Sequence, residues 1–157
     1  MLISKLENYR YLLYNVNMKI DSENEMLDFG QRFAQKLQLP AVIELIGDVG
    51  AGKTTFTRGL ASGLGVKEAI TSPSFTLSKR YAFPGGELIH YDFYRLDDPG
   101  IMRDELAESL SEPNSVVVVE WGGGVADLLP TNKYHLEIRL NADGSRTIVG
   151  ANNETLS

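Results

Sequence analysis

A glycine-rich segment followed by a lysine and a threonine is the part of the sequence whose residue types and spacing most directly indicate chemistry. Residues 47–54, Gly-Asp-Val-Gly-Ala-Gly-Lys-Thr, meet the pattern Gly-x4-Gly-Lys-Thr. Glycines let the backbone curl so that its N–H groups converge on phosphates. In this pattern the lysine, here Lys53, reaches the β- and γ-phosphates, and the hydroxyl of Thr54 ligates magnesium. The segment therefore predicts a P-loop that binds ATP and Mg²⁺.

An acid at the end of a neighbouring strand is needed to complete such a site. The run Val116 to Val119 predicts a strand buried on both faces, and Glu120 follows it at the carboxyl end, the edge of an α/β sheet where ligands bind. We therefore expect Glu120 to bind the metal. The alternative is that Glu120 is an ordinary solvated residue after a core strand.

Asp92 is a second candidate acid, because it comes late in the expected strand 88–94. It would hold the metal or orient the attacking water; the alternative is an ion pair with Arg95 on a loop. His90 and His135 have no partner at a metal-ligand spacing. We interpret both histidines as structural.

Hydroxyl side chains gather in residues 71–74, Thr-Ser-Pro-Ser, after the helix expected to follow the P-loop. P-loop NTPases often place a segment that senses the γ-phosphate in such a position. The alternative is an ordinary polar turn, and spacing alone does not separate the two.

The surrounding pattern supplies the elements that must position these residues. A short apolar strand is expected at 41–46 and a helix at 53–64, ended by Gly65. An amphipathic helix is expected to start at Ser22 and to continue until Pro40 ends it. Further expected elements are strands at 77–82, 88–94 and 116–119, a helix at 102–110, and a late hairpin over 136–149. Together they predict a three-layer α/β P-loop domain with a mainly parallel central sheet and a C-terminal β-hairpin.

Length and composition limit the alternatives. The 157 residues fit one domain, which we expect to span 18–157. Residues 1–17 are expected to be an extension, either an amphipathic helix including Leu13 and Val16 or a stretch preceding a natural start at Met18. The absence of cysteine fits a cytoplasmic location, and no apolar run approaches a membrane span. The net charge of −6 disfavours direct binding to nucleic acid.

Three classes of P-loop protein compete for this pattern. The nearest match to the guanine motif Asn-Lys-x-Asp, residues 132–135, lacks the final Asp, which disfavours a GTPase. The arginines are scattered and form no evident lid, so a small-molecule kinase remains only as the alternative function. Glu120 argues against a module that binds nucleotide without hydrolysing it. We expect an ATPase whose output goes to a partner.

Four segments in order resemble the bacterial TsaE family, also called YjeE. They are residues 47–59, residues 71–77 (Thr-Ser-Pro-Ser-Phe-Thr-Leu), residues 90–96 (His-Tyr-Asp-Phe-Tyr-Arg-Leu) and residues 119–121 (Val-Glu-Trp). The resemblance covers about residues 20 to 150. It implies an ATPase required for threonylcarbamoyladenosine, a modification beside the anticodon of tRNAs that read codons beginning with A.

The resemblance also implies partners. The family acts with the TsaD–TsaB complex, which transfers threonylcarbamoyl from its adenylate to tRNA, and supports or resets TsaD by hydrolysing ATP. A member of the family would then contact the tRNA only through this complex.

Site residues follow from the same resemblance. Lys53, Asp92 and Glu120 would be catalytic, with Thr54 and Glu120 on magnesium. Residues 71–76 and Trp121 would sense the nucleotide. The implied nucleotide ligands are Gly47, Val49, Gly50, Ala51, Gly52, Lys53, Thr54 and Thr55, with looser matches at Glu23 and Arg146. The sequence departs from the family pattern at 98–106 and in the bare run Gly122-Gly123-Gly124.

Overall fold

The computed structural model describes residues 15–73, 75–94, 96, 98, 100 and 102–152. Within them the strands are β1 (Asn15–Ile20), β2 (Ala41–Ile46), β3 (Ser78–Phe83), β4 (Gly86–Asp92), β5 (Ser115–Glu120), β6 (Tyr134–Leu140) and β7 (Arg146–Asn152). The helices are α2 (Glu23–Ala34), α3 (Lys53–Leu64), α4 (Met102–Leu110) and a short 3-10 helix, η1 (Gly122–Val125). None of these helices has the length and hydropathy that crossing a bilayer requires.

All seven strands belong to one sheet, in the order β1-β7-β6-β2-β5-β4-β3. The four central strands, β6, β2, β5 and β4, run parallel to one another. Antiparallel partners close both sides: β3 on β4, and β7 and β1 beyond β6. The prediction of a parallel centre with a C-terminal hairpin is confirmed.

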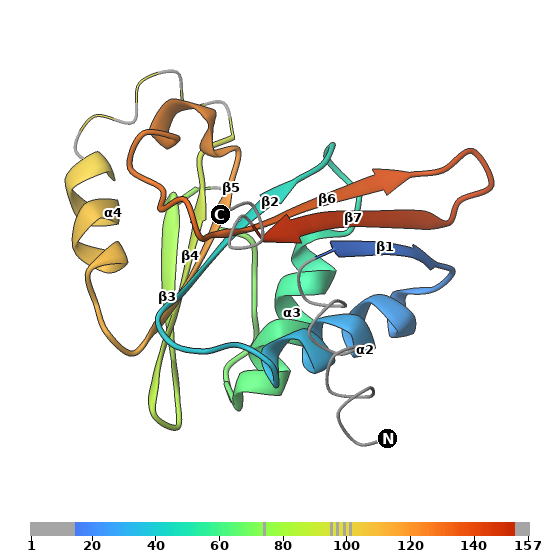
Figure 1. The fold of residues 1–157 in the computed structure, drawn as a ribbon, viewed down its shortest axis with the longest axis horizontal. Helices are drawn as coiled ribbons and strands as arrows, with labels where there is room; N and C mark the ends of the chain where they lie inside the picture. The colour runs from blue at the N-terminus through green and yellow to red at the C-terminus, as the bar shows by residue number, and fades with distance from the viewer. Residues whose placement is uncertain are drawn as a thin grey trace.

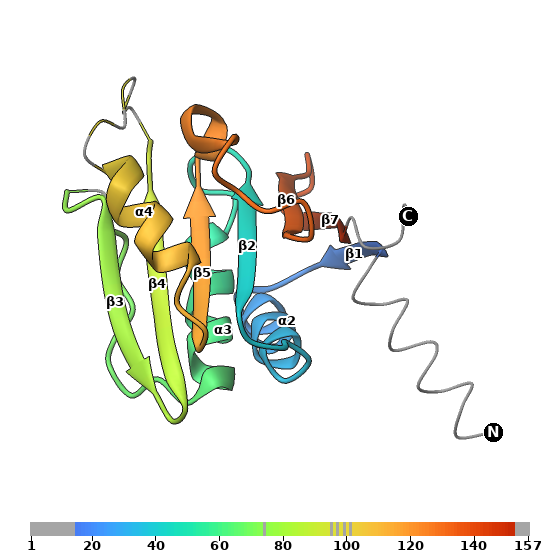
Figure 2. The same ribbon diagram turned by 60° about the vertical axis from the view of Figure 1, so that its left-hand side comes forward.

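Helices cover both faces of the sheet (Figures 1 and 2): α2 and α3 lie on one, and α4 lies on the other. The strand β5 is buried throughout, with Val116 and Val118 in the core beneath α2 and α3 and Val117 and Val119 in the core beneath α4. An unbroken run of valines suits this strand because both of its faces are apolar environments.

The structure differs from the sequence prediction at the start of the described chain. Asn15 to Ile20 form the edge strand β1, antiparallel to β7, although Val16 had been assigned to a possible helix. The rest of the predicted extension, residues 1–14, lies outside the described residues. The helix α2 begins as predicted, with the Ser22 hydroxyl accepting a hydrogen bond from the Glu25 N–H at 3.2 Å.

The end of α2 lies earlier than predicted. The last helical residue is Ala34, not a residue next to Pro40. The two following turns are tighter than α-helix, because Lys36 N–H donates to the Phe33 carbonyl and Leu37 N–H to the Ala34 carbonyl, three residues back in each case. Leu37 still packs against the core, which explains why its spacing resembled a helix.

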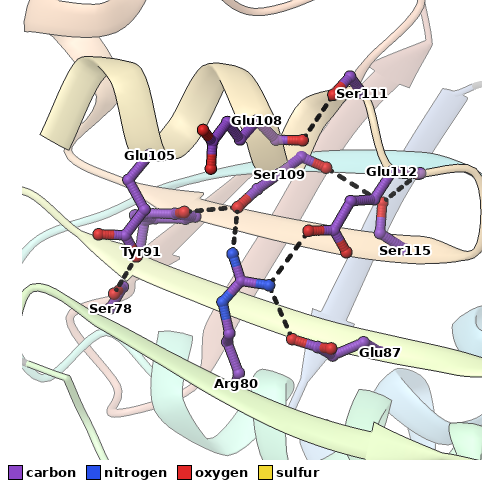
Figure 3. Close-up of polar contacts among 10 residues, drawn as sticks. All are labelled: Ser78, Arg80, Glu87, Tyr91, Glu105, Glu108, Ser109, Ser111, Glu112 and Ser115. Atoms are coloured by element: carbon purple, nitrogen blue, oxygen red, sulfur yellow. Dashed lines mark hydrogen bonds and ion pairs between the residues drawn. The ribbon is translucent and has the colours of Figure 1, made fainter.

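A polar cluster holds α4 against the sheet (Figure 3); we call it the α4 network and define it as Arg80, Glu87, Tyr91, Ser109 and Glu112. The Arg80 guanidinium donates to Glu87 at 2.9 Å, to Glu112 at 3.2 Å and to the Ser109 hydroxyl at 3.0 Å. The Tyr91 and Ser109 hydroxyls are 2.6 Å apart. Burial raises the pKa of the Tyr91 hydroxyl, so it stays neutral at ordinary pH. The network joins β3, β4 and the end of α4.

Candidate nucleotide site

The predicted P-loop connects β2 to α3 at the carboxyl edge of the parallel strands. Gly50 and Gly52 have φ angles of 83° and 115°, in the left-handed region that favours glycine. Gly52 is the N-cap of α3, and its carbonyl accepts the first helical bond from the Phe56 N–H at 2.9 Å. The loop therefore leads directly into a helix N-terminus, which attracts phosphate.

Lys53 lies at the inner edge of this loop with only 7% of its surface exposed. Its ammonium donates to the carbonyl oxygen of Gly47 and, at 3.0 Å, to that of Asp48. The same nitrogen is 4.9 Å from the centre of the Trp121 ring, within the range of a cation–π contact. The charge is thus held between the start of the loop and the residue that follows β5.

The two predicted acids lie side by side. Asp92 and Glu120 end the neighbouring parallel strands β4 and β5 and are direct partners in their register. On its other side Glu120 pairs with Leu45 of β2, two residues before the P-loop. Both residues are buried, with 5% of the surface of Asp92 and 4% of that of Glu120 exposed, and one oxygen of Asp92 accepts from the Tyr94 N–H at 2.9 Å. The alternative partner of Asp92, Arg95, lies outside the described residues.

His90 contacts one of these acids, Glu120, although the sequence predicts no such contact. Its Nε2 is 3.0 Å from Oε1 of Glu120, and the imidazole is fully buried. We call His90, Asp92 and Glu120 the acid cluster. His90 has no metal-ligand spacing to another residue, but its position two residues before Asp92 places both side chains on the same face of one strand. His135, in contrast, contacts Glu44 at 3.2 Å.

The contact between His135 and Glu44 accounts for an acidic side chain within the core strand β2, where a glutamate is unexpected. Glu44 lies within β2, where its carboxylate accepts from His135 and lies 3.9 Å from the Lys133 ammonium. Both partners come from the start of β6 or the turn before it. This ion cluster is consistent with a structural role for His135.

Trp121 and Leu77, the residue that follows the 71–76 loop, lie next to the acids, since Trp121 directly follows Glu120 and Leu77 is hydrogen-bonded to Asp92. The Trp121 backbone is left-handed, with φ of 58°, and its ring packs on Tyr94 with centroids 4.9 Å apart. At the end of the polar loop, Leu77 also has a positive φ, and its carbonyl accepts from the Asp92 N–H at 2.9 Å. Phe75, in the middle of this loop, is completely exposed, whereas Ser74 lies outside the described residues. Trp121 therefore contacts Lys53, and the residue that follows the polar loop is hydrogen-bonded to Asp92.

A pocket of about 420 Å³ adjoins the P-loop. Glu23 and Arg146, the two loosely matched residues, line it together with Gly50, Gly52, Thr54 and Thr55. Arg146 donates to the carbonyls of Ala51 and Gly50, each at 3.2 Å, and so ties the late hairpin to the loop. The buried side chains of Ile20 and Met26 provide an apolar floor.

The side chains present provide the kinds of oxygen ligand with which a P-loop site binds Mg²⁺. Among the described residues no three His, Cys, Asp or Glu side chains are grouped as a metal centre of their own. A P-loop metal site instead takes one hydroxyl and one acid, the remaining ligands being phosphate oxygens and water. Thr54, in the first turn of α3, and Glu120, at the end of β5, are hard oxygen donors of these two kinds.

The comparisons with known proteins agree on one family. The family model described as "Threonylcarbamoyl adenosine biosynthesis protein TsaE" matches residues 20–148. The tRNA threonylcarbamoyladenosine biosynthesis protein TsaE of Streptomyces coelicolor is 40% identical over 115 residues, covering 72% of this chain and 78% of that protein. The protein of the same name from Treponema pallidum is 38% identical, covering 83% and 96%. The crystal structure of Bacillus subtilis YdiB superposes with a TM-score of 0.71 at 32% identity, covering 87% of this chain and 85% of that one.

Proposed function

The chain belongs to the TsaE family of threonylcarbamoyl adenosine biosynthesis proteins, and on this premise we propose that it is a magnesium-dependent ATPase acting in that modification of tRNA. The observation that supports the proposal is the location of a P-loop lysine and two buried acids at the same edge of the sheet. Lys53 reaches that edge from α3, and Asp92 and Glu120 reach it from β4 and β5.

The nucleotide would lie across the P-loop. Its phosphates would accept hydrogen bonds from the backbone N–H groups of residues 49–54 and from the Lys53 ammonium. The nucleoside would then extend into the pocket lined by Glu23 and Arg146, where Met26 offers an apolar contact. Arg146 would act mainly by holding the loop, because its guanidinium already donates to loop carbonyls.

Thr54 and Glu120 would hold the metal ion. When bound, Mg²⁺ neutralises charge that develops on the transferred phosphoryl group. The partial positive charge at the α3 N-terminus and the Lys53 ammonium stabilise the same charge from the protein side. Asp92, adjacent to Glu120 in the register, would then accept a hydrogen bond from the attacking water and orient it.

The partner would be the TsaD–TsaB complex, with threonylcarbamoyl transferred from its adenylate. A chain with a net charge of −6 is poorly suited to bind tRNA phosphates itself, so the complex would carry the tRNA. Hydrolysis here would support repeated turnover of TsaD in the cytoplasm.

The test is a multiple-turnover assay with purified TsaD, TsaB, tRNA, threonylcarbamoyl-adenylate and Mg²⁺-ATP. Modified tRNA should exceed the amount of TsaD only when this protein is added, and the K53A variant should not replace it. The proposal fails if turnover is the same without the protein. ATP consumption that rises with a small acceptor, in the absence of TsaD–TsaB, would indicate a kinase instead.

A further inference from the structure

The contact between His90 and Glu120 assigns a role to a side chain that does not itself reach the nucleotide loop. We propose that His90 is a positioning residue: its Nε2–H holds the Glu120 carboxylate in the orientation in which it binds the metal. The inference rests on the proposed function and concerns the metal dependence of the same site.

The hydrogen-bond pattern of His90 shows which nitrogen matters. Its Nε2 is 3.0 Å from a carboxylate oxygen of Glu120, and we assign the proton to this nitrogen because carboxylate oxygens are hydrogen-bond acceptors. Its Nδ1 is buried and has no hydrogen-bond partner within the described part of the chain. An unpartnered nitrogen in the core costs stability. An apolar side chain would avoid that cost, so packing alone does not account for a histidine here.

The strand geometry explains why Glu120 needs a partner. Glu120 is the last residue of β5, and the backbone turns away immediately at Trp121, which is left-handed. A glutamate has several rotatable bonds, and Asp92 lies opposite it in the register, so repulsion between the two carboxylates favours other rotamers. His90 lies two residues earlier on β4, opposite Val118, and draws the carboxylate back over β4. One oxygen then accepts from His90 and leaves the other for the metal, as partners behind metal ligands commonly arrange.

The only tryptophan of the chain provides a readout besides activity. Trp121 follows Glu120 directly, and its ring lies 4.9 Å from the Lys53 ammonium. Its fluorescence can be followed while Mg²⁺ is titrated into the protein with adenylyl-imidodiphosphate, a non-hydrolysable ATP analogue. The Mg²⁺ concentration at the midpoint reports how well the site holds the metal.

Three variants separate positioning from packing. H90L removes the donor, and H90Q replaces it with an amide N–H at nearly the same place. Y91F is the matched control, because it also deletes a buried hydrogen bond of β4 but on the opposite face of the sheet. We expect the midpoint to rise about tenfold in H90L, the lower end of the effect that such partners have on metal sites, and to return to within about threefold of the wild type in H90Q. Y91F should leave it unchanged.

Either of two results overturns the inference: a folded H90L with the wild-type midpoint, or H90Q as impaired as H90L. If H90L does not fold, the inference is tested on the wild-type protein, because ¹⁵N NMR of its two histidines gives the tautomer of His90. His135 is identified by its loss in H135Q. A proton on Nε2 supports the proposal, and a proton on Nδ1 alone contradicts it. A wild-type protein without any Mg²⁺-dependent signal would contradict the proposed function as well, which distinguishes the two failures.

Discussion

The two faces of the sheet around β4 carry polar groups that are arranged in opposite ways. On one face, the members of the α4 network bond to one another, so that the Arg80 guanidinium meets two carboxylates and the Ser109 hydroxyl meets both Arg80 and Tyr91. On the other face, the acid cluster places two buried carboxylates next to each other with a histidine behind one of them. Residues of the two clusters alternate along β4, since His90 and Tyr91 are neighbours in the chain.

We infer from this difference that the α4 network stabilises the fold and that the acid cluster belongs to the proposed nucleotide site. Opposite charges that pair within the chain stabilise an arrangement on their own. Adjacent carboxylates of like charge at low exposure are costly unless a cation compensates them. We therefore expect changes in the acid cluster and the P-loop to affect nucleotide chemistry, and changes in the α4 network to affect the free energy of unfolding.

The largest effect is expected for K53A, on the nucleotide side. Losing charged hydrogen bonds to the phosphates should weaken ATP binding about 100-fold, equivalent to about 2.7 kcal/mol. Isothermal titration calorimetry measures this directly. K67A removes the same charge from an exposed position outside the site and should bind ATP like the wild type. Equal affinities for the two variants would show that the P-loop lysine does not contact the nucleotide.

A smaller effect, and on stability alone, is expected for R80M. Methionine keeps the apolar stem but loses one bond to buried Ser109 and two partly exposed ion pairs, which together contribute about 1–2 kcal/mol. For a chain of this size the melting temperature should fall by about 3–6 °C. ATP affinity should stay within about twofold, and a larger loss of affinity would mean that the two faces are energetically coupled.

The smallest effect is expected for Y91F, and part of it depends on pH. Losing the bond to Ser109 should cost about 1 kcal/mol at neutral pH. Burial raises the pKa of Tyr91 above its ordinary value of 10.0, so the folded state favours the neutral hydroxyl. That contribution is complete below about pH 10 and is lost as the pH rises through the higher folded pKa. Urea unfolding at pH 8 and near pH 11 should show a smaller loss in Y91F than in the wild type; parallel losses would contradict the assignment.

Local signals in the sequence were sufficient for much of the fold. The bounds of α3 and α4 are as predicted, because a Gly-Lys-Thr start, the stop at Gly65 and helical periodicity are all local features. The strand β1 is not predicted, although residues 15–20 alternate between polar and apolar side chains, because Leu13 and Val16 also fit a helical spacing. It forms by pairing with β7, more than a hundred residues later in the chain.

The same limit applies to the site. The types and order of Lys53, Asp92 and Glu120 could be predicted, because each begins or ends a recognisable element. The contact of His90 with Glu120 could not, since it depends on β4 and β5 being neighbours in one particular register. Spacing along the chain carries no information about that register, so the sequence alone predicts only a structural role for His90.

The most direct test compares E120Q with E112Q by the release of phosphate from Mg²⁺-ATP in the presence of the TsaD–TsaB complex. Each variant replaces one carboxylate by an amide of the same shape, one in the acid cluster and one in the α4 network. E120Q should bind ATP but hydrolyse it about 100-fold more slowly, as expected for the loss of a metal ligand or acid–base group. E112Q should keep the wild-type rate and lose only stability. A wild-type rate in a folded E120Q, or equal losses of rate in both variants, would contradict the assignment of the acid cluster as the site of ATP hydrolysis.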